Sequence, residues 1–174
     1  RISTSNGTGE KAQLLASGVA VPWALEAQSL LEKDWGISAD VWSVTSWSEL
    51  RRDGLNADKE NMLNPTAKPK VAYVANKLAD AQGPKIAVSD FMHAVPDQIR
   101  KWVPGTFATL GADSFGFADT RAAARRYFLI DGPSIVVQTL HTLAEEGKID
   151  ASKVQEAIEK YDLLNVNAGT TGTA

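Results

Sequence analysis

Residues 85–90, KIAVSD, indicate the fold more clearly than any other stretch of the chain. The centre of this stretch, Ile86-Ala87-Val88, is continuously apolar, which is typical of a strand that is covered on both faces. Gly83-Pro84 ends the preceding helical pattern, and Pro96 lies early in the next one. A short strand between two helices predicts a parallel sheet with helices on either side.

Outward from this strand, short apolar runs alternate with amphipathic stretches. We predict further strands at 13–17, 40–46 and 107–111, and helices at 22–35, 71–78, 96–103, 120–128, 134–146 and 150–161. Residues 47–65 are polar, and we expect them to be irregular apart from one helical turn near 48–52. The order of the elements predicts an α/β/α sandwich around a mostly parallel sheet, with right-handed crossovers.

The 174 residues, 44% of them apolar, suit one domain with a substantial core. We expect residues 1–10 to be a linker, 11–163 to form the α/β domain and 164–174 to be a flexible tail. Residues 1–10 are polar and do not form a signal peptide, so we expect the chain to begin inside a longer protein.

Charge and cysteine content exclude several classes of function. Eighteen Lys and Arg against 21 Asp and Glu give a net charge of −3, which offers no electrostatic case for nucleic acid or an anionic membrane. No apolar run approaches the ~20 residues of a membrane span. The absence of cysteine excludes disulfides, Cys-ligated zinc and thiol nucleophiles. It also fits a cytoplasmic location, although secreted proteins can lack cysteine too.

Polar side chains follow the predicted strands. In an open parallel sheet, ligands bind beyond the carboxyl ends of the strands. Those ends carry residues 17–18, residues 45–47 (of which Trp47 is the last), Ser89, Asp90 and Asp113. We therefore predict a polar crevice at this edge. The alternative is that small polar residues end strands because turns require them.

His93 and two carboxylates are the candidates for chemistry at this edge. His93 follows the third strand and would face the crevice as a base. Asp90 and Asp113 would form a carboxylate pair for acid–base work or for a cation, or else cap helices and accept loop N–H groups. The chain contains no dinucleotide or phosphate-loop motif and no established triad spacing. We therefore assign no catalytic, cofactor-binding or metal-binding residue.

The loop 113–119 carries Phe115 and Phe117 on either side of Gly116. Gly116 can adopt a backbone conformation closed to other residues and turn both rings outward. We predict that this loop, joined by Trp47, packs against another domain or a second subunit. The alternative is that both phenylalanines fill the domain's own core. The same two explanations remain open for the five tryptophans, residues 23, 35, 42, 47 and 102.

A basic stripe, Arg121, Arg125 and Arg126, lies on one predicted helix. We interpret it as a solvated helix face or as one side of an ion pair across a subunit boundary. An anion site is the alternative.

Several segments together resemble one family. They are AQLLASGVA at 12–20, DVWSVTSWSEL at 40–50, IAVSDFM at 86–92, VPDQIRKWVP at 95–104 and TLGADSFGFADTR at 109–121. In this order they resemble the transketolase-like C-terminal domain of the homodimeric bacterial pyruvate dehydrogenases, over residues 11–163. The resemblance implies a three-layer α/β/α sandwich with a mixed five-stranded sheet and one antiparallel edge strand. A run near 134–137 is the candidate for the fifth strand, in competition with the helix predicted there.

The resemblance also implies a function for the larger enzyme. That enzyme decarboxylates pyruvate and reductively acetylates a lipoyl group, using thiamine diphosphate and Mg²⁺ bound by its other domains. The family's G-D-G…N-N motif is absent here, so we expect no cofactor on this chain. The implied role is structural and concerns dimer assembly. The implied partners are the N-terminal and middle domains, the second subunit and the dihydrolipoamide acetyltransferase component. The alternative is an independent small-molecule-binding or regulatory module that uses the crevice.

Overall fold

A four-stranded parallel sheet forms the centre of the molecule. The structure, a computed structural model, describes residues 1–172. The strands are β1 (Lys11–Ala16), β2 (Ser38–Ser43), β3 (Lys85–Val88) and β4 (Phe107–Leu110). They lie in the order β2-β1-β3-β4, and each neighbouring pair is parallel. All four predicted strands are therefore present, within two or three residues of their expected bounds.

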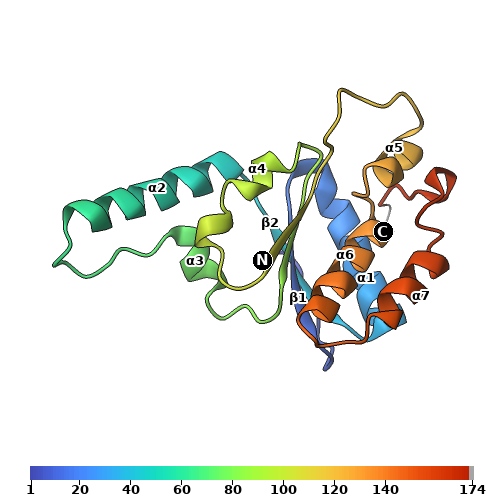
Figure 1. Ribbon diagram of the computed structural model, residues 1–174, viewed down its shortest axis with the longest axis horizontal. Coiled ribbons are helices and arrows are strands. Elements are labelled where there is room, and N and C mark those ends of the chain that lie inside the picture. Colours follow the sequence, from blue (N-terminus) through green and yellow to red (C-terminus); the bar gives the residue numbers. More distant parts are fainter. Residues whose placement is uncertain (173–174) are drawn as a thin grey trace.

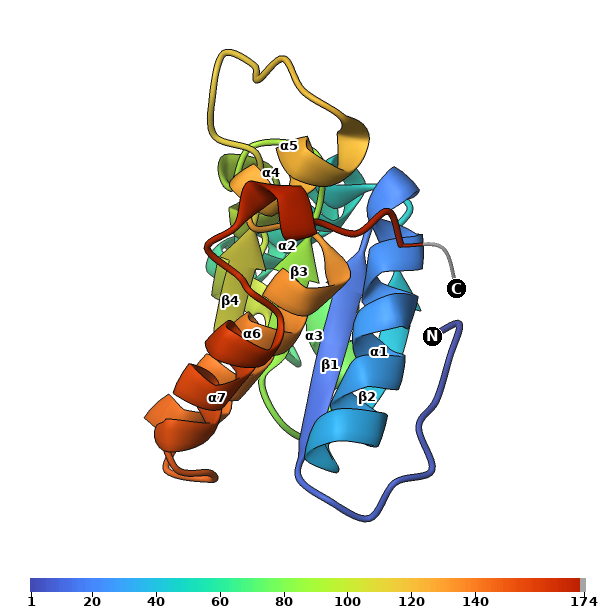
Figure 2. The ribbon, with the colours of Figure 1, turned by 90° about the vertical axis from the view of Figure 1, so that its right-hand side faces the viewer.

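Helices cover both faces of this sheet (Figures 1 and 2). One face carries α1 (Val21–Trp35), α5 (Arg121–Tyr127), α6 (Gly132–Glu145) and α7 (Ser152–Lys160). The other carries α2 (Trp47–Leu63), α3 (Tyr73–Leu78) and α4 (Ala94–Asp97). Short 3₁₀ turns lie at η1 (Gly18–Ala20), η2 (Arg100–Trp102) and η3 (Val166–Ala168). The predicted α/β/α sandwich is thus confirmed.

Successive residues of each central strand enter different cores. Leu14 of β1 and Ile86 of β3 pack with α1 and α6, whereas their neighbours Leu15 and Ala87 pack with α2, α3 and η2. All four side chains are buried. Because both faces of the strand are covered, the apolar run is continuous, as the sequence indicated.

The predicted fifth strand is wrong. Residues 134–137 lie in α6, which begins where the Asp131 side chain accepts a hydrogen bond from the Ser134 backbone N–H at 3.1 Å. Pro133 lies in the first turn of this helix, where its missing N–H costs nothing. Among the described residues, the antiparallel pairing at the sheet edge is a single bridge between Ser3 and Val41.

The irregular segment expected at 47–65 is also wrong, because α2 is a helix of 17 residues. Ser46 caps it by accepting a hydrogen bond from the Glu49 N–H at 3.2 Å. The helix extends away from the sheet (Figure 1) and buries only Trp47, Gly54 and Ala57. An exposed helix needs no long apolar stripe, so hydrophobic periodicity did not detect it.

The two ends of the chain lie against the domain. Ile2 and Ser3 hydrogen-bond to Val41 of β2. Near the other end, the Thr170 N–H donates to Asp131 at 3.2 Å and Arg125 donates to the Thr171 carbonyl at 2.9 Å. The segment predicted as a tail therefore lies along the body as far as residue 172, and its positions 173–174 fall outside the described residues. Across residues 1–172, no helix is both long enough and apolar enough to cross a membrane.

Candidate functional site at the carboxyl edge of the sheet

The carboxyl ends of the strands meet at one edge, as predicted, but a tryptophan fills the position next to β1. Trp47 is only 4% exposed, and its Nε1 donates to the Ser17 Oγ at 3.0 Å. Ser89, which follows β3, is fully buried and its Oγ donates to the Phe91 carbonyl at 3.4 Å. Trp47 and Ser89 thus belong to the packed interior. The prediction that Trp47 joins an exposed patch is wrong, because its indole has a polar partner inside the domain.

The turn that follows β3 and the loop that follows β4 are joined by a histidine–aspartate pair. The Asp113 Oδ2 lies 2.8 Å from the His93 Nδ1, and the Asp113 Oδ1 accepts the His93 backbone N–H at 2.9 Å. Both side chains are partly exposed to solvent. A carboxylate at Nδ1 orients the imidazole ring, so that Nε2 is the nitrogen that would accept a proton.

Asp90 is exposed on the same turn as His93. The predicted partner of Asp90, Asp113, is instead engaged with His93. Throughout residues 1–172, no three His, Asp or Glu side chains gather in a way that could hold a metal ion. The His93–Asp113 pair is therefore the one piece of acid–base geometry that the structure brings together among the predicted residues.

The loop between β4 and α5 presents aromatic rings to solvent. This loop rises above the edge of the sheet in Figures 1 and 2. Phe115 is fully exposed, and Gly116 has φ +131° with open space where a side chain would lie. Phe117 stacks on Tyr127 with ring centroids 4.2 Å apart and is partly exposed. The alternative in which both phenylalanines fill the domain's own core is wrong for Phe115.

We use the name apolar edge for the exposed large apolar side chains on this loop, on the turn after β3 and at the end of α5. Its members are Phe91, Met92, Phe115, Phe117 and Tyr127. The two turns are in contact, because the Ala112 N–H donates to the Phe91 carbonyl at 2.9 Å. Large apolar side chains gathered on one surface are typical of a protein–protein interface.

The five tryptophans favour the domain's own core over an interface. Trp23 and Trp47 are buried, and the other three are partly buried. The indole N–H groups of Trp35, Trp42, Trp47 and Trp102 donate to partners within the domain, such as Gln13 for Trp42 and Tyr161 for Trp35.

Sequence reasoning missed a buried ion pair behind this edge. Arg126, expected on a solvated stripe, is 1% exposed, and its Nε donates to the Asp131 Oδ2 at 2.9 Å. Its Nη1 donates to the carbonyls of Tyr161 and Asp162, both at 3.0 Å. The pair therefore connects α5, α6 and the end of α7. A helix-capping Asp followed by Gly-Pro, five residues after an Arg, was the only available signal.

A cavity at this edge lies beside the end of β2 rather than between β1 and β3. It has a volume of about 830 Å³ and is lined in part by Thr45, Ser46, Asp53 and Tyr73. The Asp53 carboxylate accepts the Tyr73 backbone N–H at 2.6 Å. Thr45 and Ser46 are the members of the predicted crevice that line an open space.

The three-layer arrangement is shared with a solved structure. A solved structure titled "Split gene transketolase, inactive beta4 tetramer" shares the fold with a TM-score of 0.54 and 18% identity, over 82% of this chain and 42% of that one. The family of transketolase-like TK C-terminal domains matches residues 2–131. The chain belongs to this family.

Curated relatives carry one shared name. The chain is 55% identical over 159 residues to the pyruvate dehydrogenase E1 component of Mycolicibacterium smegmatis. The aligned residues make up 91% of this chain and 17% of that protein. It is 52% identical over 161 residues to the same component of Corynebacterium glutamicum, covering 92% of this chain and 18% of that protein. With the same component of Escherichia coli K12 the identity is 40% over 164 residues, which cover 94% of this chain and 18% of that protein. The chain thus spans less than a fifth of the length of these relatives.

Proposed function

We propose that this chain is the C-terminal domain of a pyruvate dehydrogenase E1 component and that it serves the assembly of that enzyme. The observation that carries the assembly role is Phe115, a fully exposed aromatic ring on a loop at the carboxyl edge. Leaving such a ring in water forgoes ~25 cal/mol for each Å² of apolar surface that a partner would cover. The E1 assignment is supported by the curated relatives.

The partner that we propose for the apolar edge is the rest of the same enzyme. Either the N-terminal and middle domains or the second subunit of a homodimer would cover Phe115 and Phe117. In support, the alignment with the Mycolicibacterium smegmatis relative covers only 17% of that protein, so most of it lies outside the region that this chain matches. We also propose a cytoplasmic location and the dihydrolipoamide acetyltransferase component as a partner of the whole enzyme, both as implied by the family resemblance.

We place the cofactors of the enzyme outside this chain. The proposed activity is the decarboxylation of pyruvate and transfer of the acetyl group to a lipoyl group, with thiamine diphosphate and Mg²⁺. Residues 1–172 offer no cluster of three ligating side chains for the metal ion. The support for this proposal is the absence of the family's G-D-G…N-N motif from the sequence, and no step of the reaction is assigned to the side chains of this chain.

Hydroxyl-radical footprinting of the intact enzyme tests the assembly role. Phe115 is fully exposed in this chain and Tyr73 of α3 is about half exposed. If the apolar edge is covered by the rest of the enzyme, Phe115 is labelled more slowly than Tyr73 after correction for intrinsic reactivity. Labelling of Phe115 at the rate of a free phenylalanine would contradict the proposal.

Substitution in the intact enzyme provides the second arm. If the second subunit covers the apolar edge, Phe115→Ser should raise the dimer dissociation constant about tenfold, because aromatic anchors dominate interface energies. If the other domains cover it, the same variant should raise the rate of proteolytic cleavage between the domains about tenfold. Met62→Ser is the matched control, since Met62 is an exposed apolar residue on α2. Sedimentation velocity measures the dimer, and limited proteolysis measures the domain contact.

A further inference from the structure

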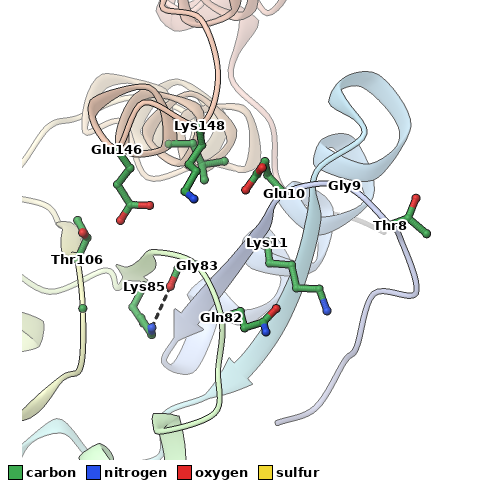
Figure 3. A pocket seen from close by; sticks show the side chains of 12 residues that line it. Thr8, Gly9, Glu10, Lys11, Gln82, Gly83, Lys85, Thr106, Glu146 and Lys148 are labelled. Atoms are coloured by element: carbon green, nitrogen blue, oxygen red, sulfur yellow. Dashed lines mark hydrogen bonds between the residues drawn. The ribbon is translucent and has the colours of Figure 1, made fainter.

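A polar cavity lies at the opposite edge of the sheet, where the strands begin. It has a volume of about 750 Å³ and lies between the starts of β1 and β3, the turn before β4 and the end of α6. Figure 3 shows its charged lining, which includes Glu10, Lys11, Lys85, Glu146 and Lys148. Small-molecule sites in proteins commonly have volumes of ~300–1,000 Å³.

Lys85 is the unusual residue in this cavity. It is 5% exposed, and it is the only buried lysine in the part of the chain that the structure describes. Its Nζ donates to the Gly83 carbonyl at 2.9 Å, but no carboxylate of residues 1–172 lies within 4.0 Å of it. A buried ammonium group without a close counter-ion is costly.

Burial lowers the pKa of Lys85, and the more distant charge of Glu146 only partly opposes this effect. The ammonium group therefore lacks the stabilisation that a directly bound anion would supply. An anion held against Nζ would favour the charged form of Lys85.

Although it is buried from bulk solvent, Lys85 lines the cavity. Gly105 adopts φ +77°, and a side chain there would begin 3.6 Å from the Lys85 Nζ. Gly105 therefore brings the backbone of the turn before β4 close to the Lys85 ammonium at the wall of the cavity. In Figure 3 the Lys148 ammonium and the Glu146 carboxylate extend from the end of α6 towards the segment that carries Lys85.

We propose that this cavity binds a small oxyanion, the carboxylate or phosphate group of a metabolite, with the Lys85 ammonium as its principal ligand. Lys148 completes the site from above, and Lys11 adds positive charge at the rim. Three lysines and two glutamates give the lining a net charge of 3 − 2 = +1. This balance suits an anion of one or two charges, and the two glutamates repel larger polyanions.

The test uses the intact protein that contains this chain, with inorganic phosphate and malonate as the two probes and chloride at equal ionic strength as the blank. Hydrogen exchange followed by mass spectrometry locates binding, and calorimetry measures affinity. We expect slower exchange in peptides that cover 8–11, 82–85, 105–107 and 143–148. The probe that binds more tightly identifies the phosphate or the carboxylate as the natural group.

Charge variants make the proposal specific to this cavity. Lys85→Gln should weaken binding about tenfold and Lys148→Gln about threefold, since charge-assisted hydrogen bonds are lost. Glu146→Gln should strengthen binding, because it removes a negative charge that repels the anion and keeps the size of the side chain nearly unchanged. Lys153→Gln, on the exposed face of α7, is the matched control and should leave affinity unchanged.

Two results would overturn the proposal. One is unchanged exchange in all four peptides at saturating phosphate and malonate. The other is equal affinity of the Lys148→Gln, Glu146→Gln and Lys153→Gln variants. Lys148 and Glu146 are exposed, so these variants decide the outcome even if Lys85→Gln does not fold.

Discussion

Tyr161 joins the end of the chain's last long helix to α1. Its hydroxyl accepts a hydrogen bond from the Trp35 Nε1 and donates one to the Asp34 Oδ2, both at 2.9 Å. Burial raises the pKa of Tyr161, so the hydroxyl remains a donor throughout the ordinary pH range. The Tyr161 and Trp35 rings also meet edge to face, at 6.4 Å between centroids.

We predict that Tyr161→Phe lowers the free energy of unfolding by about 1–2 kcal/mol, because the ring contact remains while two hydrogen bonds are lost. Urea denaturation measures the change. Tyr73→Phe, at an exposed tyrosine, is the control and should stay within about 0.5 kcal/mol of wild type. Equal midpoints for the two variants would show that the Tyr161 hydroxyl contributes nothing.

Glu26 gives the domain a pH dependence. Burial raises the pKa of Glu26, the nearby Asp131 adds to this effect, and a hydrogen bond from Thr170 at 3.0 Å opposes it. As pH rises above the ordinary value of 4.5, the unfolded chain loses its proton first. Glu26 therefore lowers the free energy of unfolding progressively as pH rises from 4.5 through its raised pKa, and the full cost is present above that pKa.

We predict that Glu26→Gln raises the unfolding midpoint at neutral pH and that this gain disappears in acid, below the ordinary pKa of a glutamate. Thermal unfolding across a pH series measures the difference. Glu32→Gln, an exposed glutamate on the same helix, should show no such dependence. A gain that is equal at acid and neutral pH would assign the effect to packing rather than to ionisation.

At the scale of elements, α2 shows how a polar helix is attached. Gly54 leaves room for the Trp102 ring, and a Cβ at this position would lie 2.4 Å from it. The Trp102 indole N–H is held by Asp58 of the same helix at 3.2 Å. Trp102 therefore lies across α2 and cannot move away easily.

We predict that Gly54→Ala destabilises the domain by about 1–3 kcal/mol through this overlap, although alanine is the better helix former. Asn56→Ala is the control, because Asn56 is exposed on the same helix and should gain slightly from its helix propensity. Denaturant unfolding compares the two. A stabilised Gly54→Ala variant would mean that Trp102 does not rest on this helix.

At the scale of the whole molecule, the chain spans less than a fifth of its curated relatives. We predict that it has no pyruvate decarboxylase activity by itself. A steady-state assay with pyruvate, thiamine diphosphate, Mg²⁺ and a reducible dye measures this. Turnover that survives repurification of the chain would contradict the placement of the cofactors outside it.

The sequence by itself determined the sandwich and part of the site. The continuous apolar run of β3 required cover on both faces, and parallel strands with intervening helices followed from local periodicity. The exposed aromatic loop was also predictable, since Phe115 lies next to Gly116 in a segment that is too polar to be a strand. These features depend on residues that are close together in the chain.

Only the tertiary structure decided which polar and aromatic residues lie inside. Trp47 is buried because Ser17, 30 residues away, accepts its indole proton. Arg126 is buried because carbonyls 35 and 36 residues further on meet its guanidinium group. Lys85 begins a strand, yet it is the folding of α6 against the sheet that surrounds it with a charged cavity. Periodicity records local geometry, whereas the burial of a polar group depends on a partner that only the folded chain brings into contact.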